Sequence, residues 1–252
     1  MTWPFENDTS GIVKRISNRS ISANRKRNIF IVLTIVLASA LLSAIVLYGF
    51  GVMQETQNRN QKTAQIMYHA ISEQQGQELY KQEEIAWVGE FFNAFSEQVN
   101  HSTVNFTYAN ADMLTSQSMP YSGDLPASEN EIVVQESFLD SLGYSNELGQ
   151  TIQIPFSDGT THDFKLTGIL DVKTGDIGRY TAIISKELVR QQYGDGGMID
   201  YYIGLKGAQN MSEEEATNYA NTLAQQLKIS DDNVIVRSTY FNLKDENHGS
   251  DM

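Results

Sequence analysis

The sequence contains no cysteine among its 252 residues. A chain without cysteine forms neither a disulfide framework nor a metal site with thiolate ligands. A small extracellular module held together by disulfides is therefore excluded. The absence is compatible with an oxidising or a reducing compartment.

The signatures of catalysis and metal binding are also missing. The four histidines are scattered along the chain, and no H-E-x-x-H motif, EF-hand loop or G-x-S-x-G elbow occurs. Asp158, His162 and Asp163 lie close together, but they occupy an expected turn, where polar residues are common. We therefore predict that the protein is not an enzyme, with no catalytic residue, metal ligand or cofactor in this chain.

Three further segments have compositions that binding sites can share. The glycine clusters 175–178 and 194–197 lack the Lys-Ser/Thr of a phosphate-binding loop, and we interpret them as turns. The aromatic stretch Trp87–Phe95 is interpreted as core, with a ligand groove as the alternative. The sequence identifies no substrate-binding residue.

Charge is divided unevenly along the chain. Residues 1–28 carry six basic and two acidic side chains, which leaves 12 basic and 29 acidic residues after position 28. A surface with this acidic excess repels phosphate backbones, so we expect no nucleic-acid partner.

A single long apolar run, Ile29–Met53, contains 25 residues without a charge. As a helix it would be roughly 37 Å long, enough to cross a hydrocarbon core of about 30 Å. A buried core helix seldom runs this far without a charged face. A cleaved signal peptide would have a shorter basic region and a small-residue cleavage site, whereas Gln54-Glu55 follows this run. We predict an uncleaved transmembrane helix in the lipid bilayer.

The flanking charges predict the orientation of this helix. The basic cluster Arg25–Arg27 precedes it, so residues 1–28 are expected in the cytoplasm and residues 54–252 outside it. Within the first segment, Gly11–Ser22 places isoleucines and a valine among basic residues. This pattern predicts a small amphipathic helix on the anionic inner leaflet, with a solvated basic tail as the alternative.

No second apolar run of comparable length follows, and residues 54–63 are expected to continue the membrane helix as a polar stalk. Strands and helices then alternate, which predicts an α+β domain. The expected strands are 64–71, 85–95, 103–108, 132–134, 180–185, 201–205 and 233–237, with a hairpin at 151–170. The expected helices are 73–82, 136–142 and 212–228, the second ended by Gly143 and the third begun by a Ser212–Glu215 capping box. Gly123-Asp124-Leu125-Pro126 is expected as a loop, and 244–252 as a loose tail.

The order of these features resembles the MacB/FtsX-type ABC transporter permeases. A basic start leads through Asn24–Asn28 into the first membrane helix, and two internal segments are similar to the family's pattern. The first is "G-x-L-P … N-E-I-V … L-G", carried by Gly123–Pro126, Asn130–Val133 and Leu142-Gly143. The second is "L-G-x-x-I … F-x-V-x-G-I", carried by Leu148–Ile152 and Phe164–Ile169.

The resemblance covers roughly residues 10–240 and implies a MacB-like extracytoplasmic α+β domain with two subdomains. It further implies a bacterial permease subunit in the cell membrane, coupled to a separate cytosolic ATPase and to a second permease subunit. An extracytoplasmic substrate or partner of unknown identity is also implied. Because the family has further membrane helices after this domain, we expect the chain to be the N-terminal part of a longer permease. The alternative is a single-pass extracytoplasmic sensor or binding protein, and an anchored hydrolase is a third reading.

Overall fold

The computed structural model describes residues 9–172, 179–194 and 199–241. The chain divides into two compact units, Met1–Gln57 and Asn58–Met252, which are treated separately. The interpretations of segments 175–178 and 195–197 as turns, and of the tail 244–252, lie outside the described residues.

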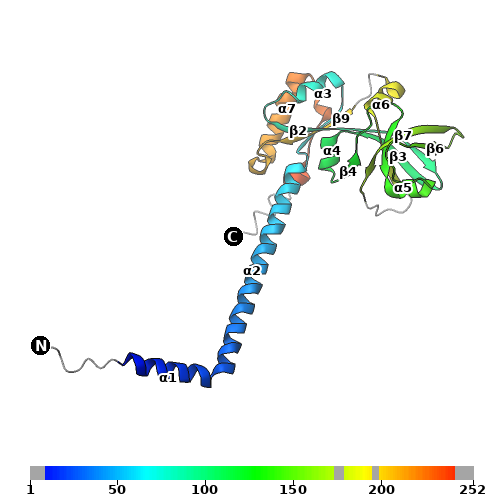
Figure 1. Ribbon diagram of the computed structural model, residues 1–252. Coiled ribbons are helices and arrows are strands. Elements are labelled where there is room, and N and C mark those ends of the chain that lie inside the picture. The colour runs from blue at the N-terminus through cyan, green and yellow to red at the C-terminus, as the bar shows by residue number, and fades with distance from the viewer. Residues whose placement is uncertain (1–8, 173–178, 195–198, 242–252) are drawn as a thin grey trace. The chain divides into compact units, whose positions relative to one another are not determined.

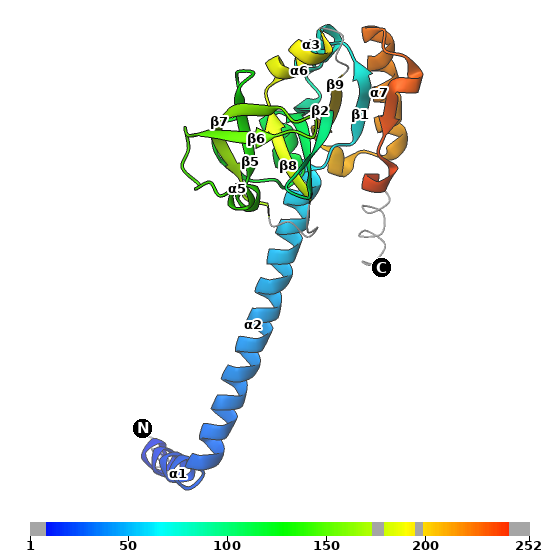
Figure 2. The ribbon, with the colours of Figure 1, turned by 90° about the vertical axis from the view of Figure 1, so that its right-hand side faces the viewer.

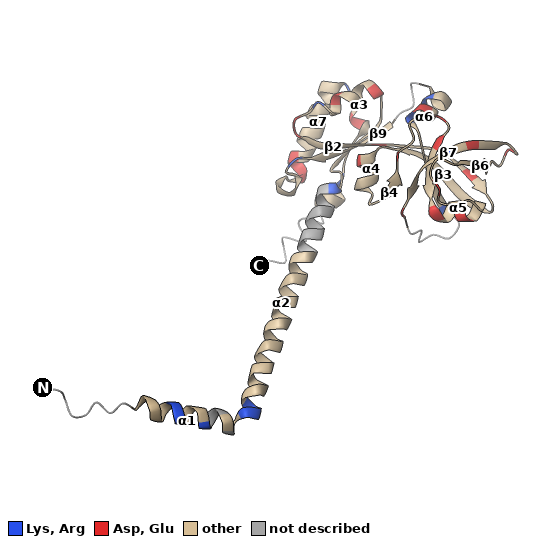
Figure 3. Cartoon of the chain, viewed as in Figure 1, with Lys and Arg blue, Asp and Glu red and all other residues tan. Residues whose placement is uncertain are grey.

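The described part of the first unit is almost entirely helical. Helix α1 (Ser10–Ala23) confirms the helix predicted at Gly11–Ser22, and Ile12, Val13 and Ile16 are exposed on it. Figure 3 shows basic residues along α1 and at the start of α2 (Arg25–Lys62), while acidic residues recur over the elements of the second unit.

Helix α2 contains a candidate membrane span over Arg25–Gly51, judged by length and composition. None of that apolar stretch is buried against other residues. Its hydroxyl groups bond back to the helix, since Thr34 donates to the Phe30 carbonyl at 2.8 Å and Ser39 to the Val36 carbonyl at 2.9 Å. The helix continues to Lys62, so the polar stretch that was expected to extend it is helical.

The second unit is a mixed α/β domain (Figures 1 and 2). Its strands are β1 (Ile66–Ile71), β2 (Ile85–Val99), β3 (Ser102–Ala109), β4 (Tyr121–Gly123), β5 (Glu131–Gln135), β6 (Thr151–Pro155), β7 (Thr161–Leu170), β8 (Arg179–Ile184), β9 (Ile199–Leu205) and β10 (Val234–Val236). Its helices are α3 (Glu73–Leu79), α4 (Ala111–Ser116), α5 (Glu136–Leu142), α6 (Lys186–Tyr193) and α7 (Glu213–Leu227), with short 3-10 turns at Ala208–Asn210 and Asp231–Asn233.

The described strands form one sheet in the order β10-β1-β9-β2-β3-β8-β5-β7-β4, with β6 paired to β7. Strand β2 joins the two halves of this sheet, as Figure 1 shows. Its first residues, Ile85–Phe91, pair with β9, and Phe91–Val99 pair with β3. The sheet is therefore continuous, although different helices cover its two halves.

Two large hydrophobic cores lie on these halves. The first packs α3 and α7 against β1 and β9, and the fully buried Tyr68 and Tyr201 belong to it. The second packs α5 and α6 against β3, β5, β6, β7 and β8, around Phe106 and Phe138. The two cores share one sheet and belong to one compact unit, so the division into two subdomains stays a prediction.

Local sequence signals explain most element boundaries. Ser212 and Glu215 form the predicted capping box, and Gly143 ends α5 in a left-handed conformation at φ 78°. Gly123 was expected in a loop but closes strand β4, where its φ of 84° and its approach to the Thr167 carbonyl leave no room for a Cβ atom. Helices α4 (six residues) and α6 (eight residues) were not predicted.

Candidate functional site

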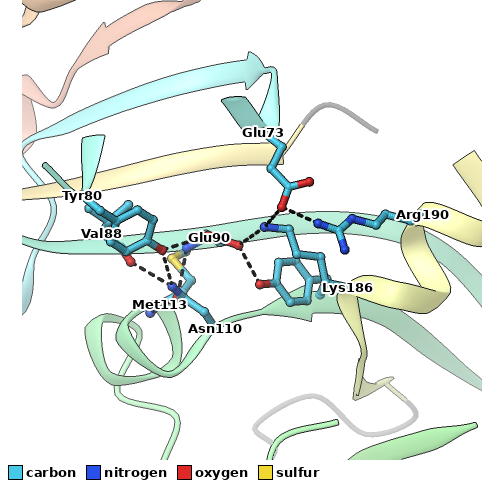
Figure 4. Close-up of polar contacts among 9 residues, drawn as sticks. Glu73, Tyr80, Val88, Glu90, Asn110, Met113, Lys186 and Arg190 are labelled. Atoms are coloured by element: carbon cyan, nitrogen blue, oxygen red, sulfur yellow. Dashed lines mark hydrogen bonds and ion pairs between the residues drawn. The ribbon is translucent and has the colours of Figure 1, made fainter. Parts of the chain in front are cut away.

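Glu90 lies at the junction of the two sheet halves, and the residue is only 4 % exposed. Strand alternation directs it to the face that α6 covers, opposite to its neighbour Phe91. A buried carboxylate needs hydrogen bonds or a counter-charge, since removal from water is otherwise costly. Glu90 has both, as Figure 4 shows.

Two tyrosines donate hydrogen bonds to the carboxylate oxygens of Glu90. Tyr80, at the end of α3, donates to Oε1 at 2.8 Å, and Tyr108 of β3 donates to Oε2 at 2.6 Å. Burial raises the pKa of both phenols above its ordinary value of 10.0, and the adjacent Glu90 charge raises it further. The tyrosines therefore stay protonated and act as permanent donors.

The positive charge comes from helix α6, which Ser185 caps by accepting from the Leu188 N–H at 3.0 Å. Lys186 places its ammonium 2.8 Å from Glu90 Oε2 and 3.1 Å from Glu73 of α3. One helical turn later, Arg190 pairs with the same Glu73. The Arg190 hydrogen bond is the main cause of the lowered pKa of Glu73.

Asn110 holds the backbone around this network. Its carboxamide oxygen accepts from the N–H groups of Glu90 and Met113, at 3.0 and 2.9 Å, and so caps α4. Its carboxamide nitrogen donates to the Val88 carbonyl at 2.9 Å. One side chain thereby fixes β2 relative to the loop after β3.

The Glu90 network is defined here as Glu73, Tyr80, Glu90, Tyr108, Lys186 and Arg190. Its two carboxylates and two cations balance, and Glu90 already accepts three donors. A carboxylate engaged in this way is poorly suited to take a proton from a substrate. The arrangement instead fastens α3 and α6 to the strands where the sheet halves meet.

A groove runs beside α6 and begins at the outer edge of this network. Its polar part, about 590 Å³, is lined by Ala127, Glu129, Lys186, Glu187, Arg190 and Gln191. A second part, about 200 Å³, shares Glu129 and Gln191 with the first and contains Phe95, Phe156 and Phe164. The α6 groove thus offers charges of both signs at one end and aromatic surface at the other.

The described histidines lie in β1, in the β2–β3 turn and in β7, and His248 lies outside the described residues. His69 pairs with Asp200 at 2.7 Å, and His101 lies in the β2–β3 turn with φ 67°. His162 contacts Phe156, with ring centroids 4.3 Å apart and the rings tilted by 34°. Within the described chain, no group of three or more His, Cys, Asp or Glu residues could hold a metal ion.

The Asp158–Asp163 segment has the contacts of a turn, as interpreted. Asp158 accepts from the Thr160 N–H and hydroxyl at 2.8 and 2.6 Å, and these bonds lower the pKa of its carboxyl. Asp163 accepts from Gln153 across the hairpin at 3.0 Å. Asp158, His162 and Asp163 therefore belong to the β6–β7 hairpin, and the contacts of the two aspartates stabilise its turn and its strands.

The Glu90 network was missed at the level of sequence. Most of the aromatic residues of Trp87–Phe95 do pack against the cores, which agrees with the core interpretation. The signal within that stretch was Glu90 itself, a single carboxylate among apolar residues. Its partners lie 10 to 96 positions away, so spacing could not identify them.

A family model described as the MacB-like periplasmic core domain matches residues 29–234. Among solved structures, the periplasmic region of MacB from Actinobacillus actinomycetemcomitans is 12% identical, with a TM-score of 0.48 over 74% of this chain and 92% of that one. The extracellular domain of the noncanonic ABC-type transporter YknZ from Gram-positive bacteria is 9% identical, with a TM-score of 0.51 over 69% and 100% of the two chains. The likeness to the YknZ domain shows a shared fold. A comparison with curated proteins found no match.

Proposed function

The chain belongs to the family of MacB-like periplasmic core domains, and from this premise we propose that it acts as a permease subunit of an ABC-type transporter. Its domain engages a substrate or partner outside the membrane, and a separate cytosolic ATPase supplies the energy. Helix α2 crosses the membrane with residues 1–28 in the cytoplasm. A second permease subunit, identical or different, completes the pair.

One observation carries this proposal. The family match begins at residue 29, inside the candidate span, and extends to residue 234 in the last described strand. Helix and domain therefore belong to a single family pattern, as expected where a membrane helix and an extracytoplasmic domain work together.

The residues that follow α2 are bonded to the sheet in a way that would transmit a movement of the helix to the strands. Gln65 follows the end of α2 by three residues and is 1 % exposed. Its N–H donates to the Ile203 carbonyl at 2.9 Å, and its side-chain oxygen accepts from the Leu205 N–H at 2.8 Å. Its carbonyl accepts from the Arg237 N–H at 2.8 Å. A displacement of the chain at Gln65 would therefore reach β9 and the segment after β10 directly.

The Glu90 network would carry that displacement across the sheet. Strand β9 pairs with β2, which holds Glu90, and Lys186 joins Glu90 to α6 beside the groove. In this mechanism ATP binding by the cytosolic subunit moves the membrane helices, and the domain changes its hold on a ligand in response.

The test is co-purification. The full chain, tagged and extracted from its native membrane in a mild detergent, should bring down an ATPase encoded beside it, and the complex should hydrolyse ATP. Reading the gene beyond codon 252 for three further apolar spans tests the same proposal independently. If no ATPase is recovered while the chain still binds an extracytoplasmic ligand, the permease role is wrong and a single-pass sensor or binding protein replaces it.

A further inference from the structure

A second cavity opens on the opposite face of the central strands from the Glu90 network. It measures about 220 Å³ and is lined by residues of β2, β3 and β8 together with α4 and the segment that follows it. We call it the polar pocket, because five of its ten lining residues, Asn93, Asn105, Thr107, Gln117 and Thr181, carry an amide or a hydroxyl group.

Strand register assembles these side chains. Asn93 pairs with Thr107, and Thr107 pairs in turn with Ile183, so the three lie in one row across the sheet. In the next row Asn105 pairs with Thr181. Since side chains two apart on a strand share a face, Asn105 and Thr107 project to the same side.

Thr107 is the most buried of the polar residues that line the pocket. Its residue is only 6 % exposed, yet no hydrogen bond joins its hydroxyl to any part of the chain that the structure describes. The same holds for the side-chain amides of Asn93 and Gln117 and for the Thr181 hydroxyl. In the described chain the buried side-chain atoms without a hydrogen-bond partner are the hydroxyls of Ser137, Tyr201 and Tyr219, so the Thr107 hydroxyl is open to the pocket, where it meets water or a ligand.

The lining excludes several ligand classes. None of the ten lining residues is charged, so nothing compensates the charge of a phosphate, a carboxylate or an ammonium group. An acyl chain would cover the amides and hydroxyls without bonding them, at a cost of about 1–3 kcal/mol each. A peptide cannot be added as a strand over β3 and β8, because each is already paired on both sides.

We propose that the polar pocket binds a single ring of a neutral saccharide. Sugar hydroxyls donate and accept, and the amides of Asn93 and Gln117 offer both functions. Phe91 and four aliphatic or thioether side chains supply an apolar surface for the C–H face of the ring. Because drug-sized pockets start at about 300 Å³, this smaller space suits one ring of a longer glycan that continues into solvent.

This inference rests on the proposed function only in that both give the domain an external ligand. The probes are N-acetylglucosamine and glucose, added to the full chain in phospholipid nanodiscs. Ligand-observed saturation-transfer NMR detects the weak binding expected of a single ring. The natural chain should transfer magnetisation to at least one of the two sugars.

The variants locate the binding. Asn93→Leu and Thr107→Val each remove hydrogen bonds, and each should weaken binding about three- to tenfold, because a lost bond costs about 0.5–1.5 kcal/mol. Asn218→Ala, at an exposed position of α7, should leave binding unchanged. Asn93 is exposed, so its variant tests the pocket even if Thr107→Val fails to fold.

Three results would overturn the proposal: no transfer to either sugar, equal transfer in the Asn93→Leu and natural chains, or binding of glutamate or trialanine that Asn93→Leu abolishes. Failure here is separate from failure of the permease role. Sugar binding without a recovered ATPase contradicts the transporter assignment, whereas ATPase recovery without sugar binding contradicts the pocket assignment alone.

Discussion

The ammonium of Lys186 lies 2.8 Å from the carboxylate of Glu90, although 96 positions separate the two residues in the sequence. One belongs to the first turn of α6 and the other to β2 at the point where the two halves of the sheet meet. The pair is mostly shielded from water, with side-chain exposures of 19% and 6%. Several consequences of this placement are open to measurement.

Replacing Lys186 by methionine should destabilise the domain strongly. Glu90 would keep its two tyrosine donors but lose its counter-charge while still buried, at a cost of roughly 3 kcal/mol. Urea unfolding of the detergent-solubilised chain, followed by circular dichroism, measures the difference. Glu90→Gln combined with Lys186→Met should recover much of the loss, and Lys81→Met, at an exposed pair with Glu78, should cost under about 1 kcal/mol. Equal effects at Lys186 and Lys81 would contradict the role of the buried pair.

Asn110→Asp should also destabilise the fold, although the two side chains have nearly the same shape. The carboxylate keeps the cap on α4 but loses the donation to the Val88 carbonyl and adds negative charge beside the Glu90 network. We expect a loss of about 2–3 kcal/mol in the free energy of unfolding. Asn218→Asp, on the exposed face of α7, is the matched control and should change it by no more than about 0.5 kcal/mol. A cost at Asn110 no greater than at Asn218 would mean that the Val88 bond contributes nothing.

Acid should weaken the domain below about pH 4.5 through Glu73 and Glu131. The Arg190 hydrogen bond lowers the pKa of Glu73 from 4.5, and the N–H groups of Ala127 and Ser128 lower the pKa of Glu131. The unfolded chain therefore takes up these protons at a higher pH than the folded chain. Their contribution is complete above the ordinary pKa and is lost as the pH falls through the depressed folded pKa.

Glu131→Gln provides the check on this pH dependence. The free energy of unfolding, measured at several values between about pH 6 and pH 3, should fall less steeply in the variant than in the natural chain. Parallel curves for the two proteins would show that Glu131 does not contribute to acid sensitivity.

Gly76→Ala should strain the first core, because a Cβ atom at Gly76 would lie 2.0 Å from Cζ of Tyr201. The Tyr201 ring is fully buried and cannot move aside, so we expect a cost of about 1–3 kcal/mol. Gly11→Ala, where no atom lies within 4 Å, is the control. Adding Tyr201→Leu to Gly76→Ala should cost less than the two single changes summed, and strict additivity would argue against the clash.

The membrane orientation can be tested with single cysteines because residues 1–252 contain no cysteine. A single cysteine at Asn218 should react with a membrane-impermeant maleimide on intact spheroplasts. A cysteine at Asn18 of α1, an exposed position, should react only after lysis. The reverse labelling pattern would place the domain in the cytoplasm and remove the transporter proposal.

Local patterns were sufficient to predict much of the fold. The uncharged run after Asn28 predicted the long helix, and the Ser212–Glu215 box and Gly143 marked helix ends that the structure confirms. These signals work because each depends on residues a few positions apart. Helix α6 was not predicted because its eight residues have only two buried apolar side chains, Leu188 and Val189. Two such residues make no helical pattern in the sequence, and only their packing in the second core shows which face of the helix is buried.

The Glu90 network and the polar pocket could not be predicted from the sequence for a related reason. Glu90 could be singled out as a carboxylate in an aromatic strand, but Lys186 and Tyr108 come to it through sheet pairing. Thr107 is one of many threonines in the sequence, and only the sheet register places it in one row with Asn93 and Ile183 in the lining of the pocket. The sequence shows which side chains are polar or charged, but it does not show which of them lie close together in the fold.

The pairing of β1 with β9 and β10 joins segments from the two ends of the second unit. The second core draws on residues 99–189, a continuous stretch, whereas the first core needs residues 66–88 and 199–241 together. During synthesis at about 5–20 residues per second, residues 99–189 are complete several seconds before β9 and β10 have both been made. Until β9 and β10 emerge, β1 lacks the two strands that flank it in the finished sheet. A newly made chain should therefore depend on protection of β1 from aggregation during that interval.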